Sequence, residues 1–316
     1  MILTIKGDVA VKAKTNVTRA FTMAFVMVSL LMYPINNSKA QEAESLEPNK
    51  TFLREIYLNT KSSLKTMPYR MYVPNDYDAT KDYPIVLYLH GAGERGNDNE
   101  KHLVNNSDIL KKLISEKYRQ DYPCVILAPQ CAEDQQWVNV PWNKASYSVD
   151  GMGISVFENM ALDLLEKTMT EYNINRKKVY VIGISMGGYG TWDAISRRPD
   201  LFAAAIPVCG GGDPSKAKEI SNTAVWTFHS ADDTLVPVAG TRDMVEALKA
   251  IKADIKFDEY ETGGHGAWGP AFTNDELIPW LFSKSKKTIK ISNEPSKVNN
   301  QNQRHYCHHD TFNQNK

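Results

Sequence analysis

A serine between two glycines follows an apolar run, and this spacing suits nucleophilic chemistry. Residues 179–188 read VYVIGISMGG, so Gly183, Ser185 and Gly187 form the pattern Gly-x-Ser-x-Gly. The pattern follows a strand-like segment and precedes a plausible helix start, which is the context of a nucleophile elbow. The turn would lift the hydroxyl to the carboxyl edge of a sheet, above a helix N-terminus that favours negative charge. We therefore predict Ser185 as a nucleophile; the alternative is a glycine-rich turn whose serine has no chemical role.

A serine hydroxyl needs a general base, because it is a weak nucleophile at neutral pH. The chain order for such an elbow is serine, then an acid, then histidine. Five histidines follow Ser185: His229 lies within a strand-like run, and three lie in a polar C-terminal segment. The fifth, His265, lies in GGHGAW, directly after the last strand-like run. We predict His265 as the base; the alternative is a histidine that is simply exposed on a loop.

The acid should follow a strand that comes after the serine, where it can fix the imidazole tautomer and stabilise the imidazolium. The segment FHSADDTLVP offers Asp232 and Asp233, and CGGGD offers Asp213 one strand earlier. We favour Asp233. Asp232 and Asp213 could equally be loop caps or turn formers.

Acyl transfer also requires donors for a developing oxyanion. The backbone N–H of Met186, next to the nucleophile, is the first candidate. The second should come from the small, glycine-rich loop HGAGERG at 90–96, and we assign it to Ala92 within a register of one residue. We expect His90 to brace this loop rather than to carry protons.

The elements that must position these residues alternate along residues 51–283. Continuous apolar runs indicate strands buried on both faces, whereas 256–262 alternates and suits a strand nearer an edge. The expected strands are 54–60, 67–74, 84–91, 124–130, 179–185, 203–210, 224–230 and 256–262. The alternation with helices predicts an α/β fold, with a mostly parallel central sheet covered by helices on both faces.

Two helices show a clear apolar face. The segment 157–172 places Phe157, Met160, Ala161, Leu164, Leu165 and Met169 on one side. In 241–253 we predict Thr241 as the N-cap, with Met244, Val245, Leu248 and Ile251 facing inward.

The motifs together resemble a known superfamily. YRMYVPNDYD, YPIVLYLHGAGERGNDN, VIGISMGGYGTWDAISRRPDLFAAAIPVCGGGD, FHSADDTLVP and GGHGAW occur in order over about residues 51–283 and are similar to the α/β-hydrolases. More narrowly, they resemble bacterial secreted "predicted peptidases" of the prolyl-oligopeptidase family, which are related to polyhydroxybutyrate depolymerase-like, feruloyl and acetylxylan esterases. The resemblance implies Ser185 as nucleophile, Asp233 as acid and His265 as base. Ser230 stands where that family often has glycine.

These residues predict acyl transfer to water, but they do not identify the acyl group. The chain has no room for the propeller that gates true prolyl oligopeptidases, and no large lid is evident, so we favour small or polysaccharide-linked esters. The insert at 131–153 carries Trp137 and Trp142, which could form an aromatic wall near the serine; the alternative is that both cover the sheet edge. Trp268, beside His265, is either a further pocket residue or a packing residue. A peptidase of the same mechanism and an inactive binding protein of the same fold are the alternatives. No metal or cofactor is implied.

Composition and the two ends of the chain complete the sequence-based expectations. The 316 residues carry 37 basic and 37 acidic side chains, so nucleic-acid binding has no electrostatic support. Residues 1–40 have the layout of a secretory signal peptide, with basic residues before an apolar run that is too short to span a bilayer. We predict cleavage near Ala40, export to the periplasm or beyond, and no stable membrane insertion afterwards. Residues 41–50 are polar, and we expect them to be loosely ordered.

The C-terminal segment and the cysteines also carry expectations. Residues 284–316 are polar and rich in Asn, Gln and Lys, so we expect a disordered tail, although HYCHH at 305–309 could bind a metal by composition. Cys124 and Cys131 bracket one predicted strand, which keeps them about 23 Å apart, far beyond the reach of a disulfide. We expect mostly buried free thiols.

Overall fold

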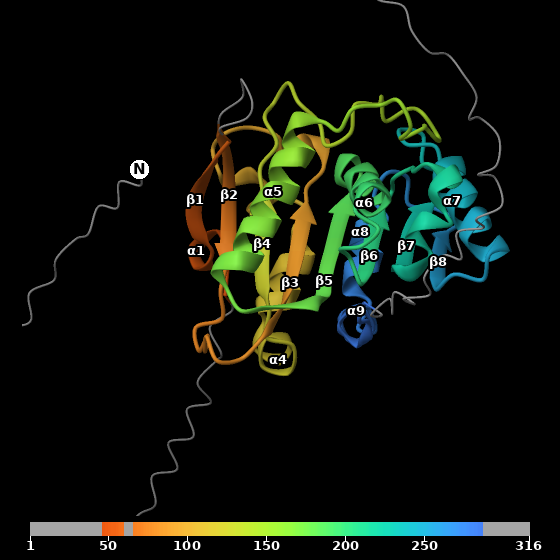
Figure 1. Ribbon diagram of the computed structural model, residues 1–316. Coiled ribbons are helices and arrows are strands. Elements are labelled where there is room, and N and C mark those ends of the chain that lie inside the picture. The colour runs from red at the N-terminus through yellow and green to blue at the C-terminus, as the bar shows by residue number, and fades with distance from the viewer. Residues whose placement is uncertain (1–45, 60–65, 287–316) are drawn as a thin grey trace, which may run out of the picture. The chain divides into compact units, whose positions relative to one another are not determined.

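The computed structural model describes residues 46–59 and 66–286, and its central feature is one sheet of eight strands. The strand order is β1-β2-β4-β3-β5-β6-β7-β8, which can be followed across Figure 1. Strands β3 to β8 pair in parallel, whereas β1 pairs antiparallel with β2 and β2 antiparallel with β4. The bounds are β1 Leu53–Leu58, β2 Thr66–Tyr72, β3 Tyr83–Leu89, β4 Val125–Pro129, β5 Ile174–Ile184, β6 Ala204–Val208, β7 Ala224–Ser230 and β8 Ile255–Tyr260. The predicted α/β fold with a mostly parallel sheet is confirmed.

Helices cover both faces of this sheet. Alternate residues of β3 illustrate the two sides, because Leu87 packs in one buried apolar cluster and Val86 in the other. The first cluster includes side chains of α5, α6 and α7, and the second those of α3, α8 and α9. The helices are α1 Pro48–Thr51, α2 Lys101–Val104, α3 Asp108–Ile114, α4 Glu116–Asp121, α5 Val156–Glu171, α6 Met186–Arg197, α7 Ala239–Ala250, α8 Trp268–Thr273 and α9 Leu277–Ser283, with short 3-10 helices η1 Ala92–Glu94, η2 Pro214–Lys216 and η3 Glu219–Asn222.

The apolar patterns explain which strands lie inside. All residues of β4, β6 and β7 are buried, as their continuous apolar runs predicted. The alternating β8 has no fully buried residue and forms one edge of the sheet, as predicted. Because β5 ends in the middle of the sheet, the turn that follows it has a neighbouring strand on each side.

The helix predictions are correct for α5 and partly wrong for α7. All six residues predicted for the inner face of α5 are buried. Helix α7 begins at Ala239, so Thr241 lies inside it and is not the N-cap; its buried hydroxyl donates instead to the carbonyl of Gly210 at 2.7 Å. Ile251 is 44% exposed, because the helix ends at Ala250 and the chain turns away there.

The N-terminal boundary also differs from the sequence prediction, because the short helix α1 (Pro48–Thr51) begins within residues 41–50, which we expected to be loose. Cys124, Cys131 and Cys209 are buried free thiols, as expected. Residues 284–286, which we assigned to a disordered tail, are ordered, and the Lys286 N–H donates to the carbonyl of Lys177 at 2.8 Å. The predictions for residues 1–40, for 287–316 including Cys307, and for the cluster at 305–309 lie outside the described residues. No helix in the described part of the chain is long and apolar enough to cross a membrane.

Candidate active site

The turn between β5 and α6 holds Ser185 in a conformation that few non-glycine residues adopt. Its φ is 54° and its ψ −117°, which lies outside the broad allowed regions for residues with a side chain. The Ser185 N–H donates to the carbonyl of Val208 in β6 at 2.8 Å, and its carbonyl accepts from the N–H of Tyr189 at 3.1 Å. These bonds join the turn to a neighbouring strand and to the following helix. Such strain is characteristic of functional sites.

Two of the motif glycines allow this close approach. A Cβ atom added at Gly183 would lie 2.1 Å from the carbonyl oxygen of Gly187, and one added at Gly187 would lie 1.9 Å from that of Leu89 at the end of β3. Both distances are far below any real contact of a Cβ atom. The start of α6 therefore packs against the backbone of β3 and β5, and only glycine fits at either position.

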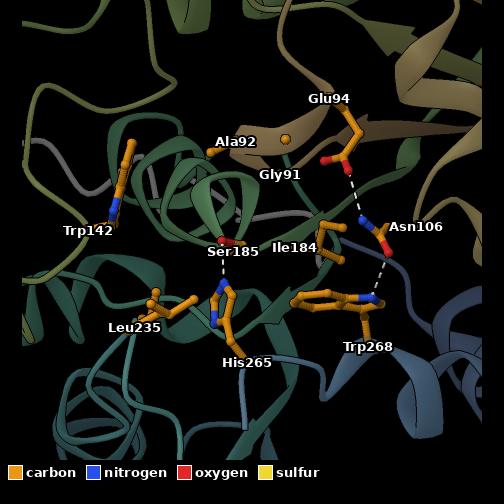
Figure 2. A pocket seen from close by; sticks show the side chains of 12 residues that line it. Gly91, Ala92, Glu94, Asn106, Trp142, Ile184, Ser185, Leu235, His265 and Trp268 are labelled. Atoms are coloured by element: carbon orange, nitrogen blue, oxygen red, sulfur yellow. Dashed lines mark hydrogen bonds between the residues drawn. The ribbon is translucent and has the colours of Figure 1, made fainter.

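His265 lies within hydrogen-bonding distance of the serine. Its Nε2 atom is 2.7 Å from Ser185 Oγ, a contact that Figure 2 shows, and its Nδ1 atom is 2.6 Å from Asp233 Oδ2. The histidine lies in the loop between β8 and α8, and Asp233 follows β7. The folding of the sheet thus brings three residues that lie up to 80 positions apart into one hydrogen-bonded chain.

The environment of Asp233 favours its ionised form. Its side chain is buried, which by itself raises its pKa. The hydrogen bonds from the Val236 N–H, from His265 and from the Leu235 N–H outweigh this effect, so the pKa lies below its ordinary value. An ionised Asp233 accepts from Nδ1–H of His265, which leaves Nε2 free to accept the proton of the serine hydroxyl.

The other candidate acids serve the main chain. Asp213 accepts from the N–H of Val149 at 2.7 Å and from that of Ser215 at 3.0 Å, so it caps a turn. Asp232 accepts from the N–H groups of Gly263 and Gly264 in the loop that carries His265. Only Asp233 of the three candidates contacts the imidazole.

A second histidine lies behind Asp233, a contact that the sequence did not indicate. His229 is fully buried in β7, with Nε2 3.2 Å from Asp233 Oδ2 and Nδ1 2.7 Å from Thr241 Oγ1. Burial lowers its pKa, and the nearby Asp233 carboxylate opposes this effect. Cys209, His229 and Asp233 form the one described group whose potential metal ligand atoms lie within 4.8 Å of one another. Since both nitrogens of His229 and the carboxylate of Asp233 already have hydrogen-bond partners, we assign no metal to this group.

Two backbone N–H groups border the serine. Met186 is the first residue of α6 and Ala92 the first residue of η1, so neither N–H has a partner within its own helix. Ala92 lines the same cavity as Ser185. The loop that carries Ala92 is braced by His90, which donates from Nδ1 to the carbonyl of Gly91 (2.6 Å) and accepts at Nε2 from the N–H of Cys131 (3.0 Å). Burial lowers the pKa of His90 to about 4, which keeps this second nitrogen unprotonated.

Trp137 is not a pocket residue, and the expectation that it walls the site is wrong. Its side chain is fully buried and its Nε1–H donates to the carbonyl of His90 at 3.0 Å. It packs against the His90 ring and against Gly190 of α6, where an added Cβ would lie 2.7 Å from that of the tryptophan. Trp137 thus supports the loop at 90–96 from behind.

Trp142 and Trp268, in contrast, both line the cavity of about 240 Å³ that contains Ser185. In Figure 2 they lie on opposite sides of the serine. The Trp268 ring meets His265 edge to face at 5.3 Å, and its Nε1–H donates to Asn106 Oδ1 at 3.2 Å. The complete lining is Gly91, Ala92, Gly93, Glu94, Asn106, Trp142, Ile184, Ser185, Leu235, Val236, His265 and Trp268.

A polar chain on one side of the cavity was not predicted. Asn106 Nδ2 donates to Glu94 Oε1 at 2.8 Å, so Glu94, Asn106 and Trp268 form one hydrogen-bonded wall (Figure 2). Burial raises the pKa of Glu94. Asn106 has a φ of 49°, and its side chain reaches the site from a segment with no recognisable motif.

A second hollow adjoins the cavity beyond Trp142 and Leu235, which line both. Its volume is about 600 Å³. The remaining lining side chains are Gln136, Pro141, Asn143 and Thr234, so no charged group borders it. The site therefore combines a small cavity at the serine with a larger, uncharged depression beside it.

The geometry is that of a nucleophile, a base and an orienting acid, with two backbone donors nearby, which can transfer an acyl group.

Residues 144–296 match the dienelactone hydrolase family. The chain is 27% identical over 92 residues to a bifunctional acetylxylan esterase/xylanase of Neocallimastix patriciarum, covering 29% of this chain and 13% of that protein. The crystal structure of a thermostable esterase is 36% identical, with a TM-score of 0.69, over 76% of this chain and 64% of the esterase. The chain thus spans less than two thirds of either relative.

A feruloyl esterase module of Clostridium thermocellum is 18% identical, with a TM-score of 0.52, over 82% of this chain and 91% of the module. At that level of identity the likeness concerns the fold. The strand order and these likenesses show that the chain has the α/β-hydrolase fold.

Proposed function

We propose that this α/β-hydrolase cleaves carboxylic esters through an acyl-enzyme on Ser185, with His265 as the base and Asp233 as the acid. The observation that carries the proposal is the unbroken chain of contacts from Ser185 Oγ to His265 Nε2 at 2.7 Å and from His265 Nδ1 to Asp233 Oδ2 at 2.6 Å. An inactive binding protein would have no need to maintain this chain together with the strained φ of Ser185.

The reaction follows from these positions. Ser185 Oγ attacks the ester carbonyl while His265 Nε2 takes the hydroxyl proton, and the charge on the carbonyl oxygen is stabilised by the N–H groups of Met186 and Ala92. His265 then protonates the leaving alcohol, and the acyl group stays on Ser185. A water molecule, deprotonated by the same imidazole, attacks the acyl-enzyme; His265 returns that proton to Ser185 Oγ as the acid is released. Every proton is thus transferred through one histidine, which the ionised Asp233 holds in the required tautomer.

The shape of the site supports small acyl groups and an uncharged alcohol. The cavity at Ser185 is small and closed on one side by Glu94, Asn106 and Trp268. The larger hollow beyond Trp142 and Leu235 is lined by amide, hydroxyl and apolar side chains, which suits a neutral hydroxylated group such as a sugar of a polysaccharide-linked ester. The likeness to an acetylxylan esterase/xylanase and to an esterase agrees with this choice.

We also propose that the protein is exported. The proposal rests on the sequence of residues 1–40, in which basic residues precede a short apolar run and small residues stand at 38 and 40. Fractionation of cells that produce the full chain, with the mass of the exported protein, tests it: cleavage near Ala40 supports export, and an uncleaved cytoplasmic chain contradicts it.

A substrate panel tests the proposed reaction. The purified protein and a Ser185→Ala variant are assayed side by side on acetyl, butyryl and feruloyl esters and on peptide amides. Ester turnover that is lost in Ser185→Ala supports the proposal. The ranking of the acyl groups by turnover rate then shows which size of acyl group the cavity accepts. Amide turnover without an ester preference would instead establish a peptidase. A folded protein that turns over none of these substrates would refute both the esterase and the peptidase.

A further inference from the structure

We propose that Asp232 is a positioning residue, whose carboxylate holds the backbone of the His265 loop and so keeps Nε2 of the imidazole on Ser185. This inference rests on the proposed function of Ser185 and His265, but it assigns a role to a residue outside that triad. Asp232 Oδ1 accepts from the N–H of Gly264 at 2.8 Å, and Oδ2 lies 3.3 Å from the N–H of Gly263. The carboxylate thus accepts from the N–H groups of the two residues that immediately precede His265.

The loop needs such support because of its own composition. Three glycines surround the histidine, at 263, 264 and 266, and each allows a wide range of backbone angles. Gly263 has a φ of 135° and Gly264 a φ of 54°, angles that residues with side chains rarely adopt. Glycine permits this turn but does not favour it over other conformations, so the ordered state must come from contacts. The two hydrogen bonds to Asp232 supply contacts from a different segment of the chain.

Asp232 and Asp233 therefore position the same histidine through different contacts. Asp233 is buried and contacts the imidazole directly, at Nδ1, where it fixes the orientation of the ring. Asp232 is exposed and contacts the main chain, where it fixes the position from which the ring extends. Two adjacent residues of the short turn after β7 thus contact both the backbone and the side chain of the loop.

Much of the cavity wall is held by contacts other than those of Asp232. Trp268 is held by Asn106 through a separate hydrogen bond, and Trp142 and Ala92 lie on other segments. Loss of the Asp232 contacts should therefore lower the fraction of molecules in which His265 is aligned, while the substrate-binding surface stays intact. The expected effect is on kcat and on the reactivity of Ser185, with KM unchanged.

The test compares Asp232→Ala with Asp232→Asn, using Asp254→Ala as the matched control. Asp254 is a loop aspartate whose carboxylate pairs with Lys284 at 2.7 Å, away from the cavity. Each protein is assayed on 4-nitrophenyl acetate and for the rate at which a 4-nitrophenyl alkylphosphonate modifies Ser185, and its folding is checked by circular dichroism. The phosphonate probe reports the alignment of serine and histidine independently of deacylation.

We expect Asp232→Ala to lower kcat and the phosphonate rate together by about 10- to 100-fold, the range that a displaced catalytic group produces, with KM unchanged. Asp232→Asn should keep most of both rates, because its amide oxygen can still accept from the Gly264 N–H. Equal rates for Asp232→Ala and the wild type would overturn the inference, and so would an Asp232→Asn variant as impaired as Asp232→Ala. A wild-type protein that fails to react with either probe would instead refute the proposed function.

Discussion

The substitution Gly187→Ala tests whether the turn after β5 requires glycine at this position, because the structure gives the size of the steric clash that a Cβ atom would cause. The added Cβ atom would lie 1.9 Å from the Leu89 carbonyl oxygen and 2.8 Å from that of His90. Both obstacles are backbone, so no side-chain rotation relieves them. Since real Cβ atoms stay beyond 3.0 Å, the start of α6 and the end of β3 must separate by about 1.1 Å.

That separation lies between the two proposed oxyanion donors. Met186 moves with α6, and Ala92 follows β3 through the loop that begins at His90. A shift of about 1 Å at a catalytic group lowers the rate by about 100-fold, and overpacking of this kind costs about 1–3 kcal/mol of stability. We therefore expect Gly187→Ala to lower kcat/KM on 4-nitrophenyl acetate by about 100-fold, and the free energy of unfolding in urea by about 2 kcal/mol.

Gly269→Ala is the matched control, because Gly269 also lies in the first turn of a helix and an added Cβ there meets no atom within 4 Å. It should keep wild-type activity and stability. A Gly187→Ala variant that equals this control in both measurements would refute the argument that the glycine is required by the approach of α6 to β3.

Three further predictions follow from individual contacts. Asp233→Asn should lower kcat by about 10,000-fold with the fold intact, because an amide stabilises the wrong imidazole tautomer; steady-state kinetics and circular dichroism check this, and a loss below tenfold would contradict it. Trp137→Phe removes the donor to the buried His90 carbonyl, so the free energy of unfolding should fall by about 1–3 kcal/mol; urea unfolding measures it, and an unchanged midpoint would exclude the supporting role. Burial and the nearby Asp193 raise the pKa of Glu158 well above its ordinary value, so the unfolding free energy of the wild type should decline as pH rises from 4.5 towards that raised pKa. Glu158→Gln should remove this part of the decline in a urea series across that range, and parallel curves for the two proteins would count against it.

Much of the fold could be predicted because strands that are buried on both faces have continuous apolar sequences. The fully apolar runs of β4, β6 and β7 and the six inner residues of α5 were all identified from residue type and spacing. The end of α7 was less predictable, because Ile251 continues the apolar spacing beyond the residue at which the helix ends. Thr241 has the residue type of an N-cap, but the structure uses its hydroxyl on the carbonyl of Gly210, a contact across 31 positions.

The site was predictable where chain order and strand ends define it, and less so elsewhere. Ser185, Asp233 and His265 were selected from their places after three strands, and the structure brings them together; their catalytic roles stay predictions. Trp137 and Trp142 lie five positions apart in one insert, and residue type cannot tell which is buried and which lines the cavity. The wall of Glu94, Asn106 and Trp268 joins three segments by side-chain contacts alone, so no local sequence pattern predicts it.

The central claim, an acyl-enzyme on Ser185, is tested most directly by rapid mixing of the protein with an excess of a 4-nitrophenyl ester, followed by mass spectrometry of the quenched sample. The account predicts a burst of nitrophenol close to the amount of enzyme, and one acyl group on the peptide that contains Ser185, both lost in Ser185→Ala. Steady ester turnover without this adduct, and undiminished in Ser185→Ala, would contradict it.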